Sequence, residues 1–311
     1  MQPKWGIRGM AVAPHSLASQ SALAVLREGG NALEAMISAA ATIAVVYPHM
    51  NSIGGDSFWV IHAPGKAIGG IDACGGAAGL ATRSWYQEQG ITGAIPFRGP
   101  VAANTVAGTI SGWGAAFDLS KKSLGGRLPL SRLLEDAIHY AEHGVPVTYS
   151  QSALTEKKRV ELSPQPGFSE TFLVKGKSPA TGSVFYQKRL ANTLRQIAKK
   201  GTNDYYRGEL AEQIAKELKQ LGSPLRLDDL QRHHAKLINP LHLAHSLADV
   251  YNMTPPTQGV VSLMILGILD QLNLKRFDVD SAEYVHHCVE ATKQAFKVRD
   301  QHVTDPAYMA H

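Results

Sequence analysis

Residues 29–59 read GGNALEAMISAAATIAVVYPHMNSIGGDSFW, and this stretch decides the fold. The glycine pair Gly29-Gly30 predicts the end of a preceding helix, because glycine adopts the left-handed C′ conformation without a Cβ penalty. Asn31, with Glu34 three residues later, predicts a capping box at the start of the next helix. Residues 35–46 are apolar on almost every helical face, which is typical of a buried helix. Its length of roughly sixteen residues is short of the ~20 that span a bilayer, so we expect a core helix of a globular protein.

A strand follows this helix. Pro48 predicts the end of the helix, and the chain then passes through the glycine turn Gly54-Gly55. Ser57–Ile61 is an aromatic and β-branched run, which predicts a buried strand. Residues 63–66 predict a hairpin loop, and residues 68–74 predict the returning strand. The stretch therefore reads as a central helix that leads into a core strand through a tight turn.

Helical periodicity predicts most of the remaining chain. It predicts helices over residues 17–28, 128–142, 190–197, 210–221, 260–272 and 282–299. Ser16 is the expected N-cap of the first of these helices. Strands are predicted over residues 9–13 and 241–251, whereas the Pro- and Ser-containing residues 151–182 predict surface loops. No period of about 20–50 residues recurs, so we expect a single domain over residues 1–311 rather than a repeat array.

Composition places the chain among globular proteins, because 44% of its 311 residues are hydrophobic and 18% are charged. The formal net charge of +5 is mildly basic. The longest basic run, Lys157-Lys158-Arg159, has no interleaved aromatic residues, which a nucleic-acid platform would need. We therefore expect a solvated basic surface and no nucleic-acid partner. The alternative is that this chain is half of a charge-balanced complex.

The two cysteines and the N-terminus bear on the cellular compartment. Cys74 and Cys288 are two isolated thiols that form no CxxC motif, so a disulfide framework is not expected. The first eight residues lack the apolar core of a secretory signal. The sequence as given predicts a cytoplasmic protein, or a periplasmic one if a signal was removed before the numbering began.

Neither a metal site nor a cofactor site is predicted. The pairs His233-His234 and His286-His287 suggest a metal, but helical neighbours point about 100° apart and do not converge easily on one ion. No HExxH motif is present. The glycine-rich residues 75–79 match neither a P-loop nor a dinucleotide-binding fingerprint. We therefore expect no bound cofactor.

Two residues near the glycine turns could carry chemistry. Asp56 could be catalytic, although a carboxylate that accepts hydrogen bonds from turn amides is the commoner arrangement. Cys74 could be a nucleophile, but the sequence supplies no obvious base for it, and most single cysteines pack inertly. A GxSxG nucleophile elbow is absent. From these motifs alone the chain shows no complete active site.

Several short landmarks follow one another in a specific order and spacing. They are residues 9–13 (GMAVA), 29–32 (GGNA), 48–49 (PH), 54–58 (GGDSF), 105–108 (TVAG), 204–208 (DYYRG), 211–215 (AEQIA), 227–230 (LDDL), 253–259 (MTPPTQG), 290–291 (EA), 293–300 and 305–306 (DP). Together they resemble the large subunit of the gamma-glutamyltransferase (gamma-glutamyltranspeptidase) family from residue 9 to about residue 309.

This resemblance implies an α+β fold, the four-layer αββα sandwich of N-terminal-nucleophile hydrolases, with this chain as its helix-rich large subunit. It implies that one precursor cuts itself and exposes a threonine at the start of a small subunit. That threonine is the nucleophile, and its own amine is the general base. Because the sequence stops at His311, before any such threonine, we expect no catalytic residue in this chain. The expected partners are the small subunit, a small-molecule amide and an acceptor amine, with no membrane.

One departure from the family pattern concerns the substrate. Members that bind glutathione carry an arginine after the hairpin, where it holds the α-carboxylate of the substrate. Here the segment reads Asp72-Ala73-Cys74-Gly75, so Cys74 stands where the arginine would be. A thiol cannot replace a bidentate guanidinium–carboxylate pair. By this resemblance Asp72, Ala73, Cys74 and Gly75 are the expected substrate-binding residues.

Three hypotheses about function follow. In the first, the protein is an amidohydrolase or acyltransferase that cleaves gamma-glutamyl or related acyl amides, with the substitution at Cys74 favouring the atypical, cephalosporin-acylase-like branch. In the second, gamma-glutamyl specificity is retained because Arg83 or a small-subunit cation replaces the missing arginine. In the third, the chain belongs to a non-catalytic binding protein.

Overall fold

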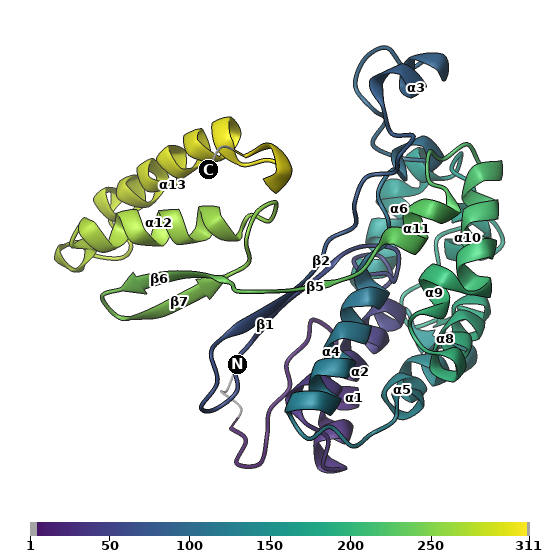
Figure 1. Ribbon diagram of the computed structural model, residues 1–311, viewed down its shortest axis with the longest axis horizontal. Coiled ribbons are helices and arrows are strands. Elements are labelled where there is room, and N and C mark those ends of the chain that lie inside the picture. The colour runs from purple at the N-terminus through teal and green to yellow at the C-terminus, as the bar shows by residue number, and fades with distance from the viewer. Residues whose placement is uncertain (1–4, 310–311) are drawn as a thin grey trace. The chain divides into compact units, whose positions relative to one another are not determined.

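The structure is a computed structural model that describes residues 5–309, and it mixes helices with small sheets (Figure 1). Its contacts group into two compact units. The first unit contains the described residues up to Ser57 together with Ala73–Ala235. The second contains Phe58–Asp72 and the described residues from Lys236 onward.

The first unit is mainly helical. Its helices are α1 (Ser16–Arg27), α2 (Ala32–Val46), α3 (Arg83–Glu88), α4 (Thr109–Ser123), α5 (Leu130–His143), α6 (Tyr149–Leu162), α7 (Phe168–Phe172), α8 (Lys188–Lys200), α9 (Asp204–Arg207), α10 (Glu209–Gln220) and α11 (Leu227–Arg232). A two-stranded antiparallel sheet pairs β3 (Val145–Pro146) with β4 (Val184–Phe185). Helix α2 packs against α1 and α5, and α5 also packs against α8. Helix α2 is therefore the centre of this unit, as the sequence predicts.

Local sequence explains why α2 begins where it does. Asn31 Oδ1 accepts a hydrogen bond from Glu34 N (3.1 Å), and Glu34 Oε2 accepts one from Asn31 N (3.0 Å), which is the predicted capping box. Gly29, with φ of 86°, follows α1 in the conformation that favours glycine. The Glu34 side chain is fully buried, and its Oε1 also accepts from Leu128 N (2.9 Å). The cap thus ties the start of α2 to the loop before α5.

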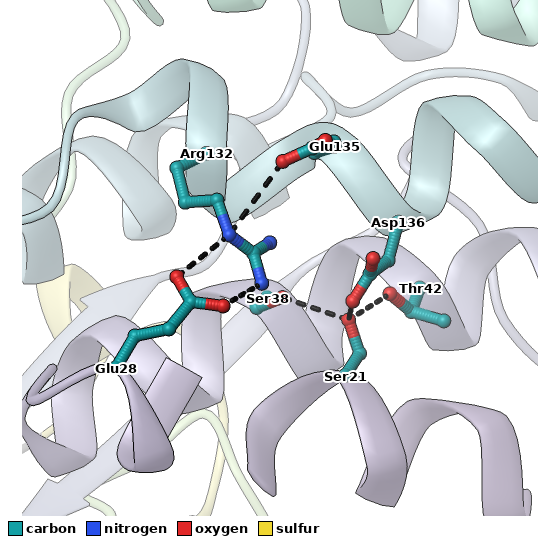
Figure 2. Close-up of polar contacts among 7 residues, drawn as sticks. All are labelled: Ser21, Glu28, Ser38, Thr42, Arg132, Glu135 and Asp136. Carbon is teal, nitrogen blue, oxygen red and sulfur yellow. Dashed lines mark hydrogen bonds and ion pairs between the residues drawn. The ribbon is translucent and has the colours of Figure 1, made fainter. Parts of the chain in front are cut away.

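A buried set of hydroxyl groups joins α1, α2 and α5 (Figure 2). Ser21 Oγ donates to Asp136 Oδ2 (2.5 Å) and accepts from Thr42 Oγ1 (3.0 Å). Ser38 Oγ lies 2.8 Å from Ser21 Oγ. Because the Ser21 proton already goes to Asp136, Ser38 is the donor to Ser21. One hydroxyl therefore uses its donor and both acceptor positions to connect three helices.

An ion pair lies beside these hydroxyls (Figure 2). Arg132 on α5 donates from Nε (2.8 Å) and Nη2 (2.5 Å) to the two carboxylate oxygens of Glu28, just after α1. Glu135 Oε2 lies 3.5 Å from Arg132 Nε. The hydrogen bonds from Arg132 hold the pKa of Glu28 below its ordinary value. This bidentate geometry adds orientation as well as charge attraction to the α1–α5 contact.

The second unit combines two small sheets with a helical hairpin. A three-stranded sheet has the order β1 (Ser57–Ile61), β2 (Gly69–Ala73) and β5 (Lys236–Ile238), and its end residues Ser57 and Ala73 belong to the first unit. Strands β6 (Leu241–His245) and β7 (Ala248–Asn252) form an antiparallel hairpin. Helix α12 (Gly259–Gln271) packs against α13 (Ala282–His302) and against both strands of that hairpin. Over residues 5–309, no helix has the length and apolar character needed to cross a bilayer.

Four sequence predictions are corrected by the structure. Residues 9–13 form no strand, and the N-cap of α1 is His15, whose Nδ1 accepts from Leu17 N (3.2 Å), rather than Ser16. Residues 151–182 are not all loop, since α6 and α7 occupy much of them. Thr148 caps α6 by accepting from Gln151 N (3.1 Å), a start signal that the Pro and Ser content obscures.

The fourth correction concerns the strand Ser57–Ile61, which the sequence predicts to be buried. It is a strand, but Phe58 is 41% exposed and Val60 is 47% exposed, while the alternate residues are half-buried. Successive side chains of a strand point to opposite faces, so one face of this strand is uncovered within the chain. An apolar run that looks like a core strand is here a strand with one open apolar face.

Candidate functional site

Three segments of the first unit come together after β2, and we call them the strand-end site: residues 54–56, 73–76 and 106–109. Asp56 Oδ1 accepts a hydrogen bond from Gly75 N (2.9 Å), and Asp56 Oδ2 lies 3.8 Å from Cys74 Sγ. Thr109, the first residue of α4, fixes the other end of this turn. Its N and its Oγ1 both donate to Gly55 O at 2.8 Å, and Oγ1 also lies 3.0 Å from Asp56 O. The site thus presents a carboxylate and a thiol side by side on a turn held by α4.

Glycines permit the close approach of the backbones at this site. A Cβ on Gly75 would lie 1.5 Å from Val106 O, and a Cβ on Gly108 would lie 2.0 Å from Ala73 O. Val106 N donates to Gly76 O (3.0 Å), which locks the two segments together. Only a residue without a Cβ fits at Gly75, because the two backbones approach each other closely there.

A buried tyrosine supports the site from the side of α9. Tyr206 Oη donates to Ala107 O (2.7 Å) and accepts from Ser111 N (2.9 Å). Its ring centroid lies 5.1 Å from that of His233. Burial raises the pKa of Tyr206 well above its ordinary value, and burial raises the pKa of its neighbour Tyr205 to about 12. The Tyr206 phenol is therefore neutral near pH 7 and holds the 106–109 segment in place rather than transferring protons.

Two hollows lie outside the three segments of this site. In the first unit, a cavity of about 490 Å³ lies between α4 and α9, where Arg207 donates to Asn203 Oδ1 (3.0 Å) and to His233 O (3.0 Å). In the second unit, a groove of about 740 Å³ follows α13 and is lined mainly by apolar side chains such as Val285 and Phe296. Within the described residues, neither hollow combines a nucleophile with a base that is oriented towards it. Neither is a candidate catalytic centre.

The four substrate-binding residues that the sequence predicts differ in burial and in the unit to which they belong. Asp72 lies in β2 opposite Lys236 of β5 and belongs to the second unit. Ala73 is fully buried, whereas Cys74 and Gly75 are half-buried at the strand-end site. The structure adds Asp56 to these last two residues, although the sequence treats Asp56 only as an isolated candidate. The four residues remain the predicted substrate contacts.

Other candidates lie apart from this site or were missed. Arg83, the proposed substitute for the missing arginine, is exposed at the start of α3. Among residues 5–309, no group of three His, Cys, Asp or Glu side chains could hold a metal ion. Sequence reasoning did not single out Thr109 and Tyr206, although the landmarks at residues 105–108 and 204–208 adjoin or contain them. Those landmarks were the available signal.

Comparisons with known proteins are consistent with these observations. A family model described as gamma-glutamyltranspeptidase matches residues 18–311. The oxamate amidohydrolase proenzyme of Klebsiella pneumoniae subsp. pneumoniae is 56% identical over 97% of this chain. The alignment covers 56% of that relative, so the chain spans about half the length of the relative it matches.

Solved structures give the same result. The crystal structure of Helicobacter pylori gamma-glutamyltranspeptidase matches with a TM-score of 0.91 and 29% identity, covering 99% of this chain and 88% of that chain. The cephalosporin acylase from Bacillus halodurans matches with a TM-score of 0.83 and 33% identity, covering 95% of this chain and 55% of that chain. The prediction of a helix-rich α+β fold of the N-terminal-nucleophile hydrolase class is confirmed by these likenesses.

Proposed function

This chain belongs to the gamma-glutamyltranspeptidase family, and from that premise we propose that it is the large-subunit part of an amidohydrolase that acts on short amides of the oxamate type. Its companion would be a second chain cut from the same precursor, because the relatives that it half covers are named as proenzymes. The large subunit would supply the scaffold and one wall of the substrate pocket.

The proposed reaction is acyl transfer to water. The N-terminal threonine hydroxyl of the second chain attacks the amide carbonyl, and its own α-amine accepts the hydroxyl proton. That proton passes to the departing nitrogen, so the C–N bond breaks, ammonia leaves and an ester links the acyl group to the threonine. Water then attacks the ester, which releases the acid and restores the threonine hydroxyl. For oxamate and one water, the products are oxalate and ammonium.

One observation on the structure supports the choice of substrate: Cys74, which stands where the resemblance implies a substrate-binding arginine, lies beside Asp56. The Cys74 thiol lies 3.8 Å from Asp56 Oδ2, so the side chains at this turn offer a thiol and a carboxylate instead of a guanidinium. A glutamyl α-carboxylate would lose the bidentate pair that an arginine provides. A short acyl group does not need that contact. The 56% identity to a protein named oxamate amidohydrolase supports the same choice.

A second candidate is an acylase for longer acyl groups, as in cephalosporin or glutaryl amides. The likeness to the Bacillus halodurans cephalosporin acylase favours it, at 33% identity. So does Gly76, where an added Cβ would meet no atom within 4 Å, which leaves room along this wall. The two candidates differ in the length of the acyl group that they accept.

An acyl-group panel on the self-cleaved protein tests the proposal. We expect ammonia release from oxamate with a kcat/KM about 10- to 100-fold above that for hydrolysis of gamma-glutamyl-p-nitroanilide or glutaryl-p-nitroanilide, which corresponds to the loss of a charged hydrogen bond by the longer acids. N-terminal sequencing of the second chain should show threonine first.

Cys74→Ser is the matched control, because a hydroxyl keeps the small size and also lacks a guanidinium. It should keep the preference for oxamate. The proposal would be overturned if the glutamyl compound were hydrolysed faster than oxamate and faster than every glutamyl analogue that lacks the amino or the carboxylate group. A preference for the glutaryl compound would select the second candidate instead.

A further inference from the structure

The Asp56 carboxylate occupies an unusual place in the strand-end site. Its Oδ1 accepts from Gly75 N, and its Oδ2 faces the Cys74 sulfur at 3.8 Å, so both oxygens lie against the segment that follows β2. The residue is exposed, and its backbone is fixed by Thr109 rather than by its own side chain. A negative charge therefore lies at the surface of this turn, held in one orientation.

We propose that Asp56 is a specificity-determining residue that disfavours acyl groups with a second carboxylate near Cys74. This inference rests on the proposed function, because it assumes that the strand-end site is a wall of the substrate pocket. A glutamyl group would bring its α-carboxylate towards this wall and meet a like charge. A two-carbon acyl group such as that of oxamate is too short for its carboxylate to do so.

The size of the effect follows from Coulomb's law in a solvated site. Two unit charges about 4 Å apart interact by about 1 kcal/mol in water, which corresponds to roughly a fivefold change in binding. The interaction should weaken as salt increases, because the Debye length falls to about 3 Å at 1 M ionic strength. The site thus lacks the arginine that would attract a glutamyl α-carboxylate, and Asp56 also repels that carboxylate. Specificity often needs such a repulsive element.

Asp56 also predicts how an arginine at position 74 would behave. A guanidinium introduced there would lie next to the Asp56 carboxylate and pair with it, so less of its charge would be available to a substrate. The substitutions Cys74→Arg and Asp56→Asn should therefore be non-additive. Residues in direct contact commonly show such coupling.

The test compares two anilides of the same length on the self-cleaved protein: gamma-glutamyl-p-nitroanilide and its α-carboxamide counterpart. Asp56→Asn keeps an oxygen that can accept from Gly75 N and removes the charge. We expect it to lower the KM of the carboxylate compound about fivefold and to leave the carboxamide compound within about twofold. The gain should shrink at 1 M salt. Cys74→Arg with Asp56→Asn should lower the KM by more than the product of the two single effects.

Asp118→Asn is the matched control, because Asp118 is exposed on α4 in the same unit and its loss changes the net charge equally. It should leave both KM values unchanged. Equal changes for the two anilides in Asp56→Asn, or strictly multiplicative effects in the double variant, would overturn the proposal.

The outcomes also separate this inference from the proposed function. A protein that does not hydrolyse oxamate refutes the function, yet the two anilides still report on Asp56. Should neither anilide be turned over, calorimetric titration gives their dissociation constants. In that case an Asp56→Asn protein that does not bind the carboxylate anilide more tightly refutes the inference.

Discussion

Two polar regions of the first unit contain similar side chains but differ in the hydrogen bonds that these side chains form. The hydroxyl cluster consists of Ser21, Ser38 and Thr42 with Asp136, on α1, α2 and α5 (Figure 2). In it, Ser21 donates one hydrogen bond and accepts two, all with side chains of other helices. At the strand-end site, Asp56 and Thr109 form most of their hydrogen bonds with the backbone. In the first region the side chains form hydrogen bonds with one another. In the second they hold the backbone of the turn, and the Asp56 carboxylate stays exposed.

The difference shows that burial distinguishes side chains that stabilise the fold from side chains that are free to contact a ligand. Buried hydroxyl groups such as Ser21 must find partners inside the protein, so their arrangement reports on stability. An exposed carboxylate such as Asp56 is solvated and needs no internal partner, so its fixed orientation calls for another explanation. Substitutions in the two regions should therefore change different measurements.

The largest effect is expected from Gly75→Ala at the strand-end site. An added Cβ would lie 1.5 Å from Val106 O and 2.6 Å from Val106 C, which are backbone atoms that cannot rotate away. The segment must shift, at a cost of about 3 kcal/mol in unfolding free energy. If the segment is the proposed wall of the substrate pocket, its displacement by about 1 Å should also reduce kcat/KM by about 100-fold. Urea unfolding and steady-state kinetics on the self-cleaved protein measure the two effects.

Gly76→Ala is the matched control for this substitution. It adds the same atom one residue later, where nothing lies within 4 Å, so its unfolding free energy should stay within about 0.5 kcal/mol of the unmodified protein. Similar stability and activity in both variants would show that the close approach to Val106 O is not a constraint.

The next effect in size should come from Ser21→Ala in the hydroxyl cluster. The change removes one hydroxyl that serves three partners and leaves the buried Ser38 and Thr42 to find other acceptors. We expect a loss of about 2 kcal/mol in unfolding free energy, measured by urea titration with an unchanged m-value. Kinetic constants should be unaffected, unlike those of the Gly75 variant.

Ser19→Ala, in the same helix and only half-buried, controls for the change in residue type. Its cost should stay within about 0.5 kcal/mol. If Ser21→Ala and Ser19→Ala are equally stable, the cluster contributes orientation without net stabilisation.

The two regions also differ in how far the sequence predicts them. The capping box joins Asn31 to Glu34, only three positions later, so the local sequence pattern is enough to predict it. The helices predicted from strong periodicity also lie close to their predicted bounds. The strand-end site depends on partners far apart in sequence. Asp56 meets Cys74 18 residues later, and Thr109 reaches Gly55 across 54 residues.

Pairs so far apart in the sequence produce no periodic pattern, so the sequence does not predict the contact between Asp56 and Cys74. The resemblance to a family indicated Cys74 alone. The strand Ser57–Ile61 shows the converse limit. Its apolar composition predicts a strand correctly, but composition does not reveal whether both faces are covered within the same chain.

The smallest effect concerns pH and two histidines near the start of α1 and the end of α2. Burial lowers the pKa of His15, and burial followed by the proximity of His15 lowers the pKa of His49. His15 Nδ1 also accepts from Leu17 N, which a proton there would prevent. The two histidines are therefore protonated near pH 6.5 in the unfolded chain but only at lower pH in the folded protein. Their contribution to the free energy of unfolding is fully present above that pH and is lost as the pH falls towards the lowered folded pKa values.

His49→Gln removes one of these titrations and the charge repulsion that it adds to His15. Above about pH 7.5 both histidines are neutral in the folded and unfolded states, so the stability difference between His49→Gln and the unmodified protein should be constant there. Below about pH 6.5 that difference should shrink, because the unmodified protein loses more stability. The Glu28 carboxylate, whose pKa is lowered by Arg132, contributes its own loss only nearer pH 4.5 and below, so the two windows separate in urea titrations at stepped pH. A difference that stays constant down to pH 5 would mean that His49 titrates alike in the folded and unfolded states, which would contradict this prediction.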